Sequence, residues 1–203
     1  MKIICIGRNY VNHIKELKNE RPEEPIFFMK PNTAILPKRN PFYIPEFSND
    51  IHHEVEIIVK ICKVGKHIDV QFAHKYYEEI SVGIDFTARD VQNQLKEKGL
   101  PWEKAKAFDN SAIIGDFVSK SEFNSLENIT FGLTKNGKKV QKSSSKYMIW
   151  KIDELISHIS KYITLKTGDI IFTGTPEGVD RVEANDVLEG FLENKKLLSL
   201  TIK

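Results

Sequence analysis

Hydrophobic side chains recur at every second position over much of this chain, and at helical spacing in only a few segments. The clearest alternation covers residues 52–62, where the odd positions from 55 to 61 are apolar and positions 54 and 56 are glutamate. Successive side chains of a strand point to opposite faces, so this pattern predicts a strand with one buried face. Residues 80–87 repeat the pattern and predict a second strand. Shorter strands are expected at residues 2–6, 129–134, 139–141, 169–173, 186–192 and 197–202.

Helical spacing is confined to three segments. Residues 9–18 place three aliphatic side chains on one stripe, which predicts a short helix. Residues 149–162 carry four isoleucines and leucines at the same spacing and predict a second one. Thr87 followed by Asp90 resembles a capping box, and it predicts a third helix that stops at Gly99.

Turn signals separate these elements. Asn136-Gly137 stands between two predicted strands and supplies the two positive φ angles of a type I′ turn, so it predicts a β-hairpin. Residues 19–25 are polar and contain two prolines, as expected of a loop. No repeat, low-complexity tract or linker divides the chain. The predicted fold class is therefore mixed β (α+β), with residues 1–203 forming one strand-dominated domain that carries a few helices at its edges.

The composition argues against several classes of protein. With 203 residues, 40% hydrophobic and 29% charged, the chain is typical of a globular protein with one sizeable core. Its 30 basic and 28 acidic residues are spread along the chain, which gives no support for a nucleic-acid partner. No apolar stretch is long enough for a membrane span or a signal peptide, so we expect a cytoplasmic protein without a membrane partner. Cys5 and Cys62 lie in apolar runs without CxxC spacing, and are interpreted as buried hydrophobic residues.

Three carboxylates stand out within the predicted strands. Glu54 and Glu56 share a strand face and lie roughly 7 Å apart, so they repel each other unless solvent or a cation separates them. On their own they are more typical of a solvated sheet surface. Asp85 changes this interpretation, because it lies late in the second strand with only small residues on its face. Three such carboxylates would suit Mg²⁺, Mn²⁺ or Ca²⁺ better than zinc.

Three further polar features have both a chemical and a structural interpretation. His13 and Glu16 lie three apart on a predicted helix, where the carboxylate could orient the imidazole as a general base, although an exposed helix face is the simpler interpretation. Lys30 precedes Pro31 at the end of an apolar run, where its ammonium could lie near a pocket or in solvent. Residues 174–178 contain two glycines after an apolar strand, which suits either an anion-binding backbone or an ordinary turn. Neither a P-loop nor a GxGxxG motif is present, so nucleotide binding is not indicated.

Seven short motifs run through nearly the whole chain. They lie at residues 7–16, 28–31, 52–56, 83–92, 98–102, 104–109 and 168–176. Examples are Gly-Arg-Asn-Tyr in the first, His-His-Glu-Val-Glu in the third and Gly-Ile-Asp-Phe-Thr-Ala-Arg-Asp-Val-Gln in the fourth. In this order they resemble the motifs of the fumarylacetoacetate hydrolase family.

The resemblance implies a single catalytic domain built on a mixed β-sheet roll, with two copies paired as a homodimer. The family's metal ligands map onto Glu54, Glu56 and Asp85, the same carboxylates that the strand pattern brings forward. The implied cofactor is Mg²⁺, with Mn²⁺ or Ca²⁺ as alternatives.

The resemblance also assigns the remaining site residues. A water-activating dyad maps onto His13 and Glu16, on a segment that orders as a lid in relatives. Lys106 matches the family's active-site lysine. The positions that line the family's pocket correspond to Arg8, Lys30, Gln92 and Thr175.

The Thr-Ala-Arg-Asp-Val-Gln and Lys-Gly-Leu-Pro-Trp segments are most similar to the acylpyruvase and oxaloacetate decarboxylase branch of that family. This implies a metal-dependent hydrolase that cleaves a C–C bond of 3-acylpyruvates, of the fumarylpyruvate or acetylpyruvate type, to pyruvate and a carboxylic acid through a metal-stabilised enolate. Decarboxylation of oxaloacetate would pass through the same enolate. The alternatives are a 2-hydroxyhepta-2,4-diene-1,7-dioate isomerase or decarboxylase of aromatic catabolism, and a catalytically silent protein that binds a small keto acid.

Overall fold

Strands β4 (Val55–Ile61) and β5 (Tyr77–Asp85) form the antiparallel centre of the largest sheet in the computed structural model, which describes residues 1–17 and 20–203. They correspond to the two alternating segments of the sequence. β11 (Ile170–Phe172) pairs with the other edge of β4, and lies parallel to β1 (Ile3–Gly7). β2 (Ile26–Lys30), β7 (Ala112–Ile114) and β8 (Val118–Ser119) complete the sheet, in the order β2-β1-β11-β4-β5-β7 with β8 also beside β5.

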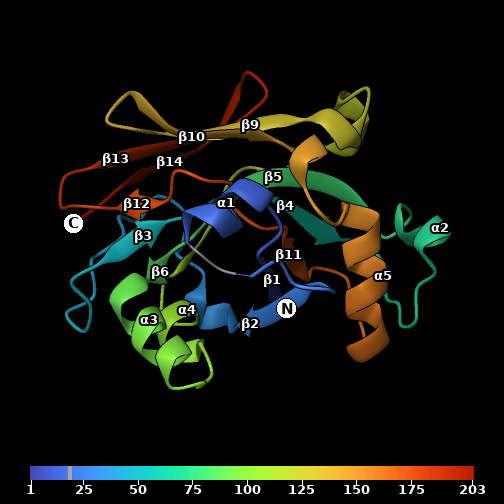
Figure 1. Cartoon of the computed structure of the whole chain (residues 1–203). Coiled ribbons are helices and arrows are strands. Elements are labelled where there is room, and N and C mark those ends of the chain that lie inside the picture. Colours follow the sequence, from blue (N-terminus) through green and yellow to red (C-terminus); the bar gives the residue numbers. More distant parts are fainter. Residues whose placement is uncertain (18–19) are drawn as a thin grey trace.

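A second sheet packs over the first one, across the top of Figure 1. Its hairpin turn has positive φ at Asn136 (54°) and Gly137 (76°), which confirms the predicted turn. Its four strands are, in spatial order, β10 (Lys138–Ser144), β9 (Thr130–Lys135), β13 (Val187–Leu192) and β14 (Lys195–Thr201). A third small sheet contains β12 (Asp180–Arg181), β3 (Ile51–His53) and β6 (Thr87–Ala88).

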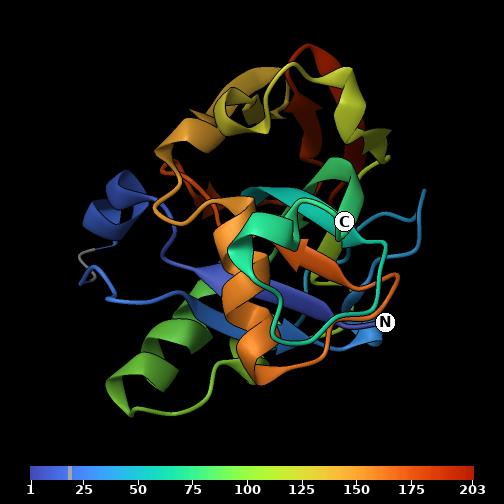
Figure 2. The ribbon, with the colours of Figure 1, turned by 90° about the vertical axis from the view of Figure 1, so that its right-hand side faces the viewer.

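Helices lie at the margins of the sheets, as predicted. Helix α5 (Ile152–Tyr162) crosses in front of β1 and β2 in Figure 2 and buries its apolar face against the main core. Helices α3 (Arg89–Glu97) and α4 (Glu103–Lys106) lie together at the lower left of Figure 1. The remaining helices of the described residues are α1 (Val11–Glu16), α2 (Val70–Ala73) and four 3₁₀ turns at Asn32–Ala34, Lys120–Glu122, Leu126–Asn128 and Ser145–Tyr147.

The two faces of β4 contact different hydrophobic clusters. Its odd-numbered residues belong to the larger cluster, which fills the space between the two large sheets and α5. Ile58 on the even-numbered face belongs to a smaller cluster with Cys5 and Phe172. The Phe172 ring packs closely over Gly83 of β5, where an added Cβ would lie only 2.7 Å from a ring carbon. Both faces of the strand are therefore buried, and this packing requires a glycine at position 83.

The strand predicted at residues 52–62 is divided at Glu54. β3 before this residue pairs with β6 and β12, whereas β4 after it pairs with β5 and β11. The chain thus passes from one sheet to another at Glu54, and its carbonyl oxygen accepts a hydrogen bond from Asp85 N (2.9 Å).

The predicted capping box of α3 is wrong. Thr87 Oγ1 donates to a backbone carbonyl two residues back, and no side chain caps the helix. The Asp90 carboxylate instead accepts hydrogen bonds from Ser48 Oγ (2.6 Å) and Asn49 N (3.0 Å). The same distant segment satisfies one N–H of the first turn, because Arg89 N donates to Asp50 O (2.8 Å). The helix ends before Gly99, whose φ of +61° fits the predicted stop.

Two smaller expectations differ from the structure. The helix predicted at residues 9–18 is shorter in the structure and covers Val11–Glu16. Residue 18 of this prediction and residue 19 of the predicted loop lie outside the described residues. Cys5 is buried as predicted, but Cys62 is exposed, because it follows the end of β4 where the even-numbered face opens to solvent. Within the described ranges no helix is long and apolar enough to cross a bilayer.

Candidate active site

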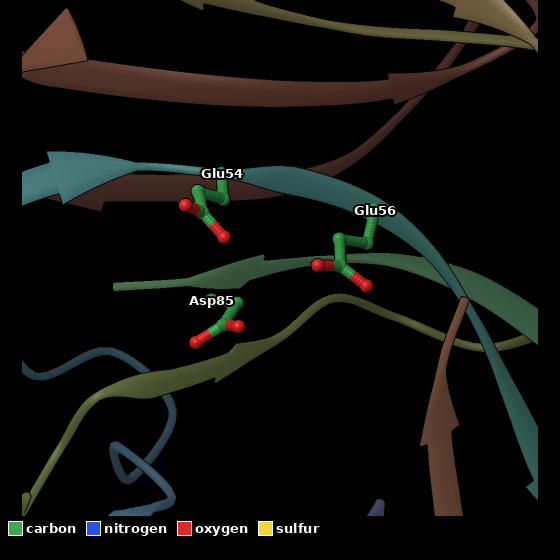
Figure 3. Close-up of side chains that lie close together, drawn as sticks. All are labelled: Glu54, Glu56 and Asp85. Carbon is green, nitrogen blue, oxygen red and sulfur yellow. The ribbon is translucent and has the colours of Figure 1, made fainter. Parts of the chain in front are cut away.

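Three carboxylates converge where β4 meets the end of β5 (Figure 3). Glu54 and Glu56 point from one face of the chain towards Asp85 on the neighbouring strand. One oxygen from each lies within 4.8 Å of the other two. The residues are only 5%, 1% and 1% exposed. They therefore form a buried cluster, which excludes the alternative of a solvated sheet surface.

The two glutamates of this cluster differ in their electrostatic surroundings. Burial opposes ionisation of Glu54, but the charges of Lys106 and Arg89 outweigh it and hold the pKa of Glu54 well below its ordinary value. Burial and the neighbouring charges of Asp85 and Glu54 raise the pKa of Glu56 well above its ordinary value. Glu56 is thus the member of the cluster whose ionised form is compensated least by the surrounding residues.

Two buried lysines form ion pairs with the carboxylates of the cluster. Lys106 Nζ lies 2.7 Å from Glu54 Oε2 and 2.8 Å from Asp85 Oδ2. Burial disfavours its charge, but the two carboxylates outweigh burial and raise the pKa of Lys106, so it is an ammonium at neutral pH. Lys30 Nζ lies 2.7 Å from Asp85 Oδ1 and donates a hydrogen bond to Ser111 Oγ (2.8 Å).

The donor set fits a divalent cation that prefers oxygen ligands. Asp85 Oδ1 is buried and, apart from its ion pair with Lys30, receives no hydrogen bond of adequate geometry from the described residues. Glu56 accepts a hydrogen bond from Gly174 N (2.6 Å) and makes no ion pair with any residue in 1–17 or 20–203. Carboxylates grouped this closely are suitable ligands for Mg²⁺ or Mn²⁺, and Glu54, Glu56 and Asp85 are the residues that would hold such an ion.

A histidine–glutamate pair lies beside the cluster, on α1. His13 Nδ1 lies 3.2 Å from Glu16 Oε2, and Glu16 Oε1 accepts a hydrogen bond from Gly178 N (3.0 Å). Burial opposes ionisation of Glu16, but the hydrogen bonds from His13 and Gly178 outweigh it and lower the pKa of Glu16. An ionised Glu16 holds the proton of His13 on Nδ1 and leaves Nε2 for proton transfer. This is the arrangement that a general base requires.

The acidic cluster, His13 and Lys106 line a cavity of about 30 Å³. The rings of Phe28 and Trp102 form an aromatic part of its wall, with their centroids 6.0 Å apart. Lys30 lies behind Asp85 and Glu16 behind His13, so neither is part of the lining. The predicted site residues that line the cavity are Arg8, His13, Glu54, Glu56, Asp85, Gln92, Lys106 and Thr175.

Comparison with known proteins identifies the family. Residues 2–200 match the family model described as fumarylacetoacetate (FAA) hydrolase C-terminal. The chain belongs to the fumarylacetoacetate hydrolase family. Among its relatives in this family, the oxaloacetate tautomerase YcgM of Escherichia coli (strain K12) is 43% identical over 188 residues, which cover 92% of this chain and 86% of the relative. The mitochondrial oxaloacetate tautomerase FAHD1 of Bos taurus is 38% identical over 201 residues, or 99% of this chain and 90% of the relative.

The fold is also that of the fumarylacetoacetate hydrolase family. The crystal structure of fumarylpyruvate hydrolase from Pseudomonas aeruginosa, in complex with Mn²⁺ and pyruvate, is similar with a TM-score of 0.94 and 34% identity. The match covers all of this chain and 89% of that one. The curled mixed sheet with few helices confirms the fold class that the sequence predicts.

Two cationic residues of this fumarylacetoacetate hydrolase site were not singled out by the sequence analysis. Arg89 forms an ion pair with Glu54, and its Nη1 donates to Gln92 Oε1 (2.6 Å). Lys96 also lines the cavity, one helical turn after Gln92 on α3. The signal for both is present in the sequence, because Arg89, Gln92 and Lys96 follow the i, i+3, i+7 spacing of one helix face.

Gln141 is a third residue that the sequence analysis did not assign. Its Oε1 accepts a hydrogen bond from Val55 N (3.0 Å), and its Nε2 donates to Thr175 Oγ1 (3.0 Å). The Thr175 hydroxyl in turn donates to Val55 O (2.9 Å). The amide thus joins the start of β4 to the loop at 174–178. No local signal marks this residue, because its partners lie far from it in sequence.

Proposed function

We propose that this member of the fumarylacetoacetate hydrolase family converts short 2-oxo acids through an enolate, with oxaloacetate as the first candidate substrate. The observation that carries the proposal is the buried cluster of Glu54, Glu56 and Asp85 with Lys106 bound across it. The names of the E. coli and bovine relatives, both oxaloacetate tautomerases, support this substrate. The Mn²⁺ and pyruvate in the Pseudomonas relative support a divalent ion, for which we propose Mg²⁺, and a pyruvate-like ligand.

The residues around the cluster suit the binding of a 2-oxo acid. A divalent cation held by the three carboxylates would supply the Lewis-acid charge that stabilises an enolate. Lys106 is an ammonium at the same place and can donate a hydrogen bond to the enolate oxygen. Gln92 accepts from Arg89 through Oε1, so its Nε2 is the group available to bind a substrate carboxylate. The rings of Phe28 and Trp102 give the cavity an apolar wall.

His13 is the residue that would move protons. In tautomerisation, Nε2 takes the proton of the enol oxygen, and C3 of the substrate receives a proton to give the keto form. In decarboxylation, the C3–C4 bond breaks, carbon dioxide leaves and the electron pair forms the pyruvate enolate, which is then protonated at C3. Glu16 holds the Nδ1 proton of His13 in both reactions.

Hydrolysis of a 3-acylpyruvate is the second candidate, and the His13–Glu16 pair favours it. Nε2 of His13 would take a proton from water, and the hydroxide attacks the distal carbonyl carbon. Cleavage of the C–C bond then gives a carboxylic acid and pyruvate enolate, which takes up the proton. One cavity can therefore serve both reactions, since they share the enolate.

Turnover of oxaloacetate and acetylpyruvate by the purified protein tests the proposal. We expect pyruvate release from at least one of them, or faster decay of enol-oxaloacetate absorbance, with magnesium and not with excess chelator. The ratio of the rates distinguishes decarboxylation from hydrolysis. No turnover of either substrate, with magnesium still bound, would contradict the proposal. In that case 2-hydroxyhepta-2,4-diene-1,7-dioate should be tested next, and failure with all three would leave a protein that only binds keto acids.

A further inference from the structure

One face of α3 is directed towards the cavity along two turns of the helix. Arg89, Gln92 and Lys96 follow the spacing that places side chains on one face, and all three line the cavity. Arg89 binds Glu54 of the acidic cluster, and Gln92 binds Arg89. Lys96 lies seven residues further along, about 10 Å of helical rise from Arg89, and so marks the side of the cavity away from the cluster.

Lys96 differs from the other lysine that lines the cavity. Lys106 is bound by two carboxylates, whereas the side-chain ammonium of Lys96 makes no hydrogen bond or ion pair with any residue in 1–17 or 20–203. Its contact is with the face of the Trp102 ring, whose centroid lies 5.6 Å from Nζ. Burial, together with the positive charges of Arg89 and Arg8, lowers the pKa of Lys96 to about 8. A half-buried ammonium among other cations is stabilised most by an anion that enters the cavity.

We propose that Lys96 binds the distal carboxylate of the substrate, and thereby makes the enzyme select dicarboxylic over monocarboxylic 2-oxo acids. This inference rests on the proposed function, because it requires the 2-oxo carboxylate end to lie at the cluster of Glu54, Glu56 and Asp85. The second carboxylate then extends along α3 towards Lys96. A lysine recognises a carboxylate as a point charge on a flexible stem, so it reads the charge more than the length of the substrate.

The proposal predicts different affinities for substrates that the acidic cluster alone would bind equally. Oxaloacetate and fumarylpyruvate carry a distal carboxylate, whereas acetylpyruvate ends in a methyl group. The cluster and Lys106 bind the end that all three share. Lys96 contacts only the end that differs, so its removal changes selectivity without removing the reaction.

The sharpest test uses a matched pair of ligands that do not need to react. 2-Oxoglutarate and 2-oxopentanoate have the same chain length and differ only in a carboxylate or a methyl group at the distal end. Calorimetry with magnesium present measures their binding to the unmodified protein and to Lys96→Gln, Lys96→Arg and Lys98→Gln. Lys98 is an exposed lysine at the end of the same helix and serves as the matched control.

We expect the unmodified protein to prefer 2-oxoglutarate by about tenfold, which corresponds to about 1.4 kcal/mol. Lys96→Gln should lose this preference, while Lys96→Arg and Lys98→Gln should keep it. In kinetics, Lys96→Gln should raise the KM for oxaloacetate and leave the KM for acetylpyruvate unchanged.

The outcomes distinguish this inference from the proposed function. Equal affinity of the unmodified protein for the two ligands, or a preference that persists in Lys96→Gln, overturns the role of Lys96 even if oxaloacetate is turned over. A preference that depends on Lys96, in a protein that turns over no 2-oxo acid, supports the inference and contradicts only the assigned reaction. Binding of neither ligand overturns both.

Discussion

The two faces of β4 are both buried, but they are buried for different purposes. The odd-numbered face carries Val55, Ile57, Val59 and Ile61, which are fully buried in the larger hydrophobic cluster. The other face begins with Glu54 and Glu56, whose carboxylates are almost as deeply buried beside Asp85. The apolar face stabilises the fold, because each methylene removed from water contributes about 0.8 kcal/mol.

Burial of the acidic face, in contrast, lowers the stability of the fold. Desolvation penalises each buried carboxylate, and the like charges of the cluster raise the pKa of Glu56. The acidic face therefore adds no stability of its own, and the stability of the strand comes from the other face. Substitutions on the two faces should therefore separate stability from metal binding.

The largest expected effect is that of Glu56→Gln on metal binding. The amide keeps an oxygen for the hydrogen bond from Gly174 N but is a much poorer metal ligand. We expect magnesium affinity, measured by calorimetry, to fall by at least about 100-fold, since even the outer partners of metal ligands contribute 10–100-fold. With chelator present, the free energy of unfolding should be unchanged or higher, because a penalised buried charge is removed.

The control for this experiment is Glu79→Gln. Glu79 lies on β5 in an exposed ion pair with Lys60, away from the cluster. This variant should bind magnesium as the unmodified protein does, and its stability should change by less than about 1 kcal/mol. Unchanged magnesium affinity in Glu56→Gln would show that the metal site does not lie on this face of β4.

The next largest effect is expected for His13→Gln. Loss of the general base should slow hydrolysis of acetylpyruvate by about 10²–10⁴-fold. Decarboxylation of oxaloacetate should suffer much less, because C–C cleavage needs no attacking water and solvent can protonate the enolate. Steady-state rates of both reactions measure the difference, with His74→Gln, at an exposed histidine, as the control. Equal losses in the two reactions would contradict water activation by the pair.

On the apolar face, Ile57→Ala should lower the free energy of unfolding by about 2–5 kcal/mol, through lost burial and the cavity that remains. Ile57→Val should cost only about 0.5–1.5 kcal/mol. Chemical denaturation measures both values. Magnesium affinity of the folded protein should not change in either variant. A loss of affinity that follows the loss of stability would show that the two faces do not act independently.

The strands and their faces could be predicted from the sequence, because alternation is a local property. The pattern at residues 52–62 and 80–87 placed Glu54 and Glu56 on one face without any knowledge of the fold. That β4 lies beside β5, and that the chain changes sheets at Glu54, depends on hydrogen bonds between distant segments. The proximity and burial of the three carboxylates are therefore seen only in the structure.

The same distinction explains the errors at α3. The predicted cap relied on a local pair, but Asp90 binds Ser48, which lies 42 residues away in sequence. The face of α3 that lines the cavity does have a local pattern in the sequence, namely the spacing of Arg89, Gln92 and Lys96. This signal has meaning only when the opposite wall of the cavity is known, because the same spacing is equally compatible with a solvated face.

The smallest expected effect concerns Asp169, a buried carboxylate that has a structural role in the same sheet. Its oxygens accept hydrogen bonds from Lys2 N and Lys166 N, both at 2.8 Å, and it forms an ion pair with Lys2 Nζ. Burial opposes its ionisation, but the hydrogen bonds from Lys2 and Lys166 outweigh it and lower the pKa of Asp169. Glu56 has only the hydrogen bond from Gly174 N and its pKa is raised, whereas the donors around Asp169 outweigh the cost of burying its charge.

A lowered pKa in the folded state means that the unfolded state binds the proton more tightly. The contribution of Asp169 is therefore complete above about pH 4, near the ordinary pKa of aspartate, and is lost as pH falls through its folded pKa. Asp169→Asn should be less stable by about 1 kcal/mol at pH 7, and this difference should shrink at acid pH. Denaturation midpoints between pH 7 and pH 3 measure it, with Asp116→Asn in an exposed ion pair as the control. A difference that does not change with pH would show that Asp169 stabilises the fold through packing. It would also show that the donors around Asp169 do not favour its ionised form, so that its contrast with Glu56 would not hold.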